Sequence, residues 1–150
     1  MEARPRAAVG EIGLDKTRRS LPLAEQLPAL RAQLDLAVEL DRPCILHCVR
    51  AYGGLLEALT GRPLPSRGLL LHAFAGAPEM IPRFAALPAP VYFSISTPDL
   101  LPHVPTDRLL IESDASPDNG RTPAHVVQFY RDHDIDPHRV AGNYLSLFPD

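Results

Sequence analysis

The sequence has little of what a strongly basic nucleic-acid-binding protein needs. It contains no run rich in Lys or Arg, and its net charge is −3 with a pI near 6.0. These values argue against a protein that holds nucleic acid by bulk electrostatic attraction. A phosphate-bearing substrate would therefore have to be held by a metal ion or by a few well-placed residues.

Sequence signals for membranes and secretion are also missing. The chain has no apolar stretch of membrane-spanning length and no recognisable signal peptide. We therefore expect an intracellular, cytoplasmic protein that makes no membrane contact. The sequence does not indicate an oligomeric state.

Cysteine is scarce, and its two copies are poorly placed for a disulfide. Cys44 and Cys48 lie four residues apart in an apolar run that predicts a strand. Alternation along a strand points both side chains to the same face, but too far apart for an unstrained disulfide. We therefore expect two reduced, buried thiols.

The length and composition fit a single domain over residues 1–150. The chain is 45% hydrophobic, which is enough for one core, and its length of 150 residues leaves no room for a second domain. Proline is abundant instead, with 17 of 150 residues against a usual share of about 5%. The prolines fall between the apolar runs, so they mark loops and helix starts.

Short apolar runs alternate with helix-like segments along the chain. Runs rich in Leu and β-branched residues predict strands near 7–14, 43–49, 68–74, 91–96 and 109–114. Helices are expected from Leu23 to about Asp41, over 51–61, after Pro78, from an N-cap at Thr122 to about His133, and over 137–148. This alternation indicates βα units on a parallel sheet, with each strand buried on both faces.

Four metal-capable side chains lie at the ends of these apolar runs: Glu11, His47, His72 and Asp114. Taken singly, each is better interpreted as a structural residue, such as a paired carboxylate or a hydrogen-bonded core histidine. Taken together, ionisable groups at so many buried strand ends are costly unless they share a cation or one another. Two imidazoles and two carboxylates suit Zn or Mn, with Mg as a further possibility.

Several motifs occur in the order seen in a known family. They are GEIGLD at 10–15, LDLAVELDRP before ILHCVRA, HAFAG at 72–76, FSIS at 93–96, PTDRLLIESDASP at 105–117 and the closing NYLSLF. Over nearly the whole chain they resemble the TatD family of metal-dependent deoxyribonucleases. The resemblance implies an α/β fold of the (β/α)8 TIM-barrel type, one or two divalent metal ions, and hydrolysis of phosphodiester bonds with DNA as substrate.

The same resemblance implies roles for individual residues. Glu11 would touch or bridge the metals, and His47 and His72 would hold one of them. Asp114 would bind the other metal or orient the attacking water, so Glu11 and Asp114 are the catalytic candidates. Asp15 either supports this site or is a loop carboxylate paired with neighbouring cations.

Arg50 is a candidate substrate-binding residue. It lies three residues past His47, just after the expected strand. A guanidinium there could meet a substrate phosphate through a bidentate fork. The alternative is a solvated arginine at a helix start.

The sequence departs from the family at its start, where the family has a strand ending in a His-x-His metal motif. We therefore expect an incomplete barrel with about the last five βα units, two open sheet edges and two fewer ligands. Two alternatives to the deoxyribonuclease follow. One is a hydrolase of another ester or lactone on the same scaffold. The other is a truncated, inactive chain with a binding role only.

Overall fold

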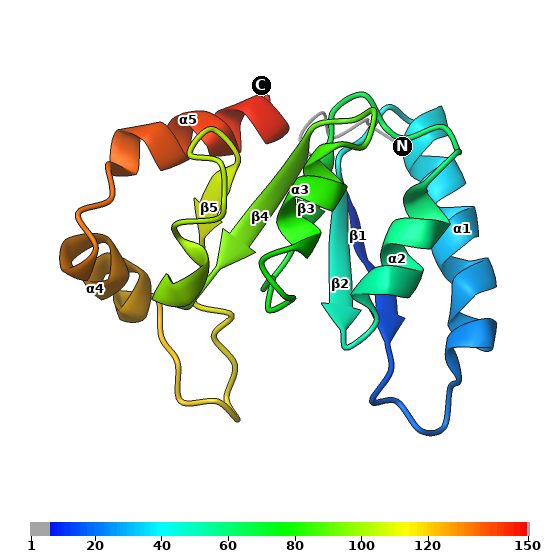
Figure 1. Cartoon of the computed structure of the whole chain (residues 1–150), viewed down its shortest axis with the longest axis horizontal. Helices are drawn as coiled ribbons and strands as arrows, with labels where there is room; N and C mark the ends of the chain where they lie inside the picture. The colour runs from blue at the N-terminus through cyan, green and yellow to red at the C-terminus, as the bar shows by residue number, and fades with distance from the viewer. Residues whose placement is uncertain (1–6, 150) are drawn as a thin grey trace.

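The computed structural model describes residues 7–149 as five strands and their intervening helices (Figure 1). In chain order the elements are β1 (Val9–Asp15), α1 (Leu23–Glu39), β2 (Cys44–Val49), α2 (Tyr52–Leu59), β3 (Leu69–Leu71), α3 (Met80–Ala85), β4 (Val91–Ile95), the 3₁₀ helix η1 (Pro98–Leu100), β5 (Leu109–Ile111), α4 (Ala124–Asp132) and α5 (Pro137–Leu147). The strands form one sheet in the order β1-β2-β3-β4-β5, and every neighbouring pair is parallel. The predicted α/β fold with five parallel strands is confirmed, and β1 and β5 form the two sheet edges.

Alternate strand residues build a separate apolar core on each face of the sheet. Leu71 and Phe93 belong to the larger core, which packs against α1, α2 and α3. Leu70 and Leu110 point the other way and pack against Val140 of α5. The sheet is therefore held between α1–α3 on one face and α5 on part of the other.

Contrary to expectation, β1 is not buried on both faces. Ile12 and Leu14 are 4% and 1% exposed, whereas the side chain of Glu11, on the opposite face, is 50% exposed. The reason is the position of α5, which packs chiefly against β5 and lies beside the starts of β4 and β5 (Figure 1). The open face of β1 and β2 is where Glu11 and His47 lie.

Two local expectations about helix ends have different outcomes. Gly61 follows α2 with a left-handed φ of 72°, which confirms it as a helix stop. The prediction of Thr122 as an N-cap is wrong, because α4 is preceded by Pro123 and has no side-chain cap. The backbone N–H of Thr122 instead donates to Nδ1 of His125 at 2.8 Å, so the histidine ring takes the place of the expected cap.

Within residues 7–149, no helix combines the length and apolarity needed to cross a membrane.

The buried cysteines give a prediction about thiol reactivity. Cys44 and Cys48 are free and buried, and burial raises their thiol pKa values from 9.0 to about 12 and about 11. Because the thiolate is the reactive form, neither should react with a thiol-specific reagent at pH 8 in the native protein. Both should react quickly in guanidinium chloride. Rapid labelling of the native protein, followed by mass spectrometry, would contradict this packing.

Candidate active site

The parallel direction of the strands brings the four predicted ligand residues to one edge of the sheet. Glu11 lies in β1, His47 lies in β2, His72 directly follows β3, and Asp114 lies three residues after β5. Together with Arg50, they line a pocket of about 490 Å³. The structure therefore brings together all five residues that the sequence analysis singled out for the site.

The Nε2 atom of His72 lies between two carboxylates. It is 3.6 Å from Oε1 of Glu11 and 3.5 Å from Oδ1 of Asp114. The side chain of His72 is 16% exposed, whereas each carboxylate side chain is 50% exposed. The imidazole is therefore the fixed part of the site, and the two carboxylates approach it from the solvent side.

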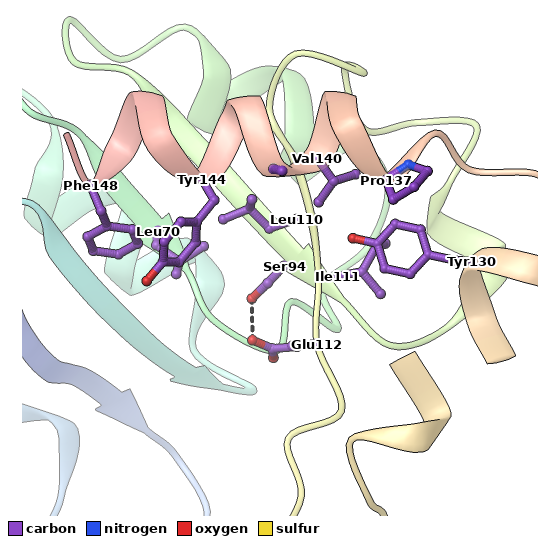
Figure 2. A pocket seen from close by; sticks show the side chains of 11 residues that line it. Leu70, Ser94, Leu110, Ile111, Glu112, Tyr130, Pro137, Val140, Tyr144 and Phe148 are labelled. Atoms are coloured by element: carbon purple, nitrogen blue, oxygen red, sulfur yellow. Dashed lines mark hydrogen bonds between the residues drawn. The ribbon is translucent and has the colours of Figure 1, made fainter. Parts of the chain in front are cut away.

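The other ring nitrogen of His72 is held by Glu112, a residue that the sequence analysis did not single out. Nδ1 of His72 lies 2.8 Å from Oε2 of Glu112, and the same oxygen accepts a 2.6 Å hydrogen bond from Oγ of Ser94 (Figure 2). A carboxylate that accepts the Nδ1 proton of a histidine fixes the ring and directs Nε2 toward a ligand. The available signal was the position of Glu112, two residues before Asp114 at the end of the same strand.

This arrangement favours a positive charge on His72. The hydrogen bond that the His72 ring donates to Glu112 is the main cause that raises the pKa of His72 from 6.5 to about 9, with further contributions from the charges of Glu112, Glu11 and Asp114. Burial acts in the opposite direction but is the weaker effect overall. The carboxylates therefore stabilise a cation at the centre of the pocket, in this case an imidazolium.

Glu11 lies between the two histidines. Its Oε2 is 4.0 Å from Nδ1 of His47, while its Oε1 faces His72. The other nitrogen of His47, Nε2, lies 3.9 Å from Oδ2 of Asp15. The structure therefore arranges Asp15, His47, Glu11, His72 and Asp114 as a chain of alternating acidic and imidazole groups.

Both interpretations of Asp15 have support in the structure. Its carboxylate lies beside His47, and it also accepts hydrogen bonds from Nε of Arg18 at 3.2 Å and from the backbone N–H of Thr17 at 2.8 Å. The hydrogen bond from the Thr17 hydroxyl is the largest cause that lowers the pKa of Asp15. Asp15 is thus a loop carboxylate that also contributes a negative charge near His47.

The side chains of this pocket are of the types that bind divalent metal ions, although they do not lie close enough together to surround one. Within residues 7–149, no group of three or more His, Cys, Asp or Glu side chains is arranged to hold a metal ion. Two ligands with bonds of about 2.1 Å to a tetrahedral ion lie about 3.4 Å apart, close to the 3.5 and 3.6 Å around His72. Glu112 also supplies the outer-shell carboxylate that metal-binding histidines usually have.

Three residues at this edge of the sheet have left-handed backbones although none is glycine. The φ angles are 53° for Arg50, 45° for Ala73 and 47° for Asp114. This conformation costs about 1–2 kcal/mol per residue, and such residues cluster at functional sites because the surrounding structure holds them there. Backbone strain at the ends of three different strands therefore supports the pocket as a functional site.

A side-chain amide holds the loop that carries Asp114. Nδ2 of Asn119 donates to the backbone oxygen of Asp114 at 2.6 Å. Its Oδ1 accepts from the backbone N–H groups of Ser116 and Arg121 at 3.1 and 3.0 Å. Asn119 was not singled out from the sequence, because its partners are backbone groups that no motif reveals.

An apolar hollow of about 360 Å³ lies next to this site, beneath α5 (Figure 2). Its walls include Leu70, Leu110, Tyr130 and Tyr144, and Glu112 lies at one end. It occupies the face of the sheet that would be the interior of a closed barrel.

The sequence matches the family model described as TatD related DNase over residues 1–139. It is 38% identical over 121 residues to the 3'-5' ssDNA/RNA exonuclease TatD of Edwardsiella piscicida, in an alignment that covers 72% of this chain and 45% of that protein. The protein of the same name from Erwinia billingiae is 34% identical over 117 residues, with the same coverage. The chain therefore spans less than half the length of these curated relatives.

Solved structures show the same architecture. The crystal structure of YJJV, a TatD homolog from Escherichia coli K12, superposes with a TM-score of 0.79 at 26% identity and covers 95% of this chain and 64% of that chain. A hydrolase TatD family protein from Entamoeba histolytica shares the fold with a TM-score of 0.71 at 16% identity, and covers 95% of this chain and 63% of that chain. The fold is therefore an incomplete barrel of the (β/α)8 TIM type, as predicted.

The bond between Glu112 and His72 gives a testable prediction. In the metal-free chain, Glu112→Gln should lower the pKa of His72 from about 9 toward 6.5, because the main group that favours the imidazolium loses its charge. NMR titration of the imidazole would measure this value. Because the folded-state pKa is raised, the stabilisation is complete below about pH 6.5 and is lost as the pH rises through about 9. In the matched control, Glu57→Gln at an exposed position of α2, the pKa of His72 should stay at the wild-type value. An unchanged value in Glu112→Gln would contradict the assignment.

Proposed function

Because the chain belongs to the family of TatD related DNases, we propose that it is a metal-dependent hydrolase that cleaves phosphodiester bonds in DNA. The observation that carries this proposal is the convergence of Glu11 and Asp114 on Nε2 of His72 in one pocket. Phosphodiester hydrolysis needs an activated water and a means of stabilising charge on the phosphoryl oxygens. The residues of this pocket offer groups for both tasks.

One or two divalent ions, Zn, Mn or Mg, would be held by Glu11, His47, His72 and Asp114. When bound, such an ion lowers the pKa of a water ligand and neutralises charge on the phosphate. Glu11 is suited to a shared position, because its two carboxylate oxygens face different histidines.

The residues around the ligands have separate tasks. Glu112 accepts a hydrogen bond from Nδ1–H of His72, so Nε2 stays directed toward the pocket. Asp114, which is half-exposed, can accept a proton from the attacking water or orient that water. Arg50, on the same pocket, can bind a substrate phosphate through its guanidinium.

Single-stranded DNA is the first substrate to test. The curated relatives are named 3'-5' ssDNA/RNA exonucleases, and the pocket of about 490 Å³ lies at the ends of the strands rather than in a closed chamber. A strand end or a flexible single strand can enter such a site without distorting a duplex.

One rival reading has an observation in its favour. The ligand shell within residues 7–149 is not closed, and the chain spans 45% of its curated relatives. The open arrangement of the candidate ligands favours a chain that binds nucleic acid without cleaving it. A hydrolase of other esters or lactones on this scaffold is distinguished by its substrate alone.

Cleavage of single-stranded DNA should require Mn, Mg or Zn and should stop when a chelator is added. Asp114→Ala should reduce the rate by about 100-fold or more, the usual contribution of a catalytic acid or base. Asp118→Ala is the matched control, because it removes an exposed carboxylate from the same loop and should leave the rate near wild type. The readout is product length from end-labelled DNA on a denaturing gel.

Other outcomes would point elsewhere. DNA cleavage that survives Asp114→Ala or the chelator would overturn the proposed site. Chelator-sensitive cleavage of small esters or lactones, without cleavage of DNA, would favour the other hydrolase. Binding of DNA without any cleavage would favour the binding-only chain.

A further inference from the structure

A second hollow at the same edge of the sheet is lined by cations. It measures about 450 Å³, and its walls are Lys16, Thr17, Arg19 and Arg50. Among the described residues, no ion pair involves Lys16, Arg19 or Arg50, and no carboxylate lines this hollow. In a chain with a net charge of −3, three cations around one hollow that have no ion-pair partner within residues 7–149 form a local site for an anion.

The backbone accounts for the proximity of these cations. The N–H of Lys16 donates to the backbone oxygen of Val49 at 2.9 Å, which continues the pairing with β2 one residue past the end of β1. Arg50 is the next residue, and its left-handed φ of 53° turns the chain at this point. The sheet itself therefore places Lys16 beside Arg50.

The loop that carries Lys16 and Arg19 is fixed by hydrogen bonds. The buried amide of Gln26 accepts from the backbone N–H of Asp15 at 2.7 Å and donates to the backbone oxygens of Asp15 and Leu21 at 2.9 and 2.6 Å. A loop held in its bound shape loses less conformational entropy when a ligand binds. The hollow is therefore preorganised.

One cation of this loop is already neutralised. Arg18 donates through Nε to the carboxylate of Asp15 at 3.2 Å, and Arg18 does not line the hollow. Lys16, Arg19 and Arg50 consequently remain available to a ligand. The ion pair between Arg18 and Asp15 therefore does not neutralise any of the three cations that line the hollow.

Arg50 connects the cationic hollow to the candidate active site, because it lines both pockets. A ligand that reaches both must carry anionic groups at neighbouring positions, as a nucleic acid strand does. We infer that Lys16, Arg19 and Arg50 form a phosphate-binding subsite, which holds a backbone phosphate of single-stranded nucleic acid next to the phosphate at the active site. This inference rests on the proposed function and names how that site holds its substrate.

The chemistry of the hollow predicts contact with the backbone of the strand rather than with its bases. Guanidinium groups bind phosphate through paired N–H donors, and a lysine supplies a compact charge. In the part of the chain that the structure describes, no aromatic side chain lines the hollow, so these residues offer no surface on which a base could stack. Binding at this subsite should therefore be independent of sequence and sensitive to salt.

The test is equilibrium binding of the full chain to a fluorescent single-stranded oligonucleotide of about 12 nucleotides, measured by anisotropy with EDTA present so that no metal-dependent cleavage occurs. The test variant is Lys16→Ala with Arg19→Ala. The matched control is Arg31→Ala with Arg42→Ala, which removes the charge of the exposed Arg31 in α1 and that of the partly exposed Arg42 in the segment that follows it. Each protein is titrated at several salt concentrations between about 50 and 200 mM.

The test variant should bind about tenfold or more weakly at low salt. The slope of log K against log salt should become shallower by about 0.7, the contribution of one phosphate of a single strand that is no longer neutralised. The control should bind like the wild type with an unchanged slope. Oligonucleotides of different sequence should bind alike.

Three results would overturn the inference: no oligonucleotide binding by the wild type, equal loss in the test and control variants, or equal affinity for an oligoaspartate of the same charge. The proposed function fails separately. If the wild type cleaves DNA and the test variant binds and cleaves DNA equally well, the subsite is rejected and the proposed function stands. If the wild type shows the predicted binding but cleaves no DNA with any metal, the proposed function is rejected and the subsite stands.

Discussion

The common direction of the five strands is the constraint on which the rest of this structure depends. In a parallel sheet all carboxyl ends meet at one edge, so residues far apart in the chain become neighbours there. His72 after β3, Ser94 in β4 and Glu112 after β5 form a polar row across three adjacent strands. The sheet can hold this row in place because α1–α3 and α5 pack against its two faces. Without the shared direction, none of these contacts would form.

The site concentrates charge at one point and anchors it unevenly. The imidazole of His72 is mostly buried and held by Glu112, whereas Glu11 and Asp114 are half-exposed. A fixed nitrogen with movable carboxylates suits a site that closes around a cation. The loop after β1 has the opposite arrangement, because Gln26 holds its backbone while its cations extend outward. Acidic and basic groups therefore lie side by side along one edge of the sheet. The acidic groups suit a metal ion, and the basic groups suit a phosphate.

The sequence alone predicted the fold better than it predicted the site. Alternating apolar runs and helical spacing indicated all five strands, because burial against α1–α3 requires that pattern. The four candidate ligand residues were chosen for their positions at strand ends, and the structure places them in one pocket. Glu112 was missed because its role depends on β3 and β5 lying on either side of β4, which no spacing in the sequence reveals. The expected cap at Thr122 was wrong because a competing contact with His125 is equally local, and the exposed face of β1 depends on where α5 packs.

Metal stoichiometry is the measurement that tests the central claim most directly. The purified chain would be incubated with Mn or Zn, freed of excess metal and examined by elemental analysis. The account predicts one or more retained equivalents, lost in His47→Ala with His72→Ala and kept in His103→Ala with His138→Ala, a pair of exposed histidines outside the pocket. A folded wild-type chain that retains no metal, or equal retention by both variants, would contradict the account.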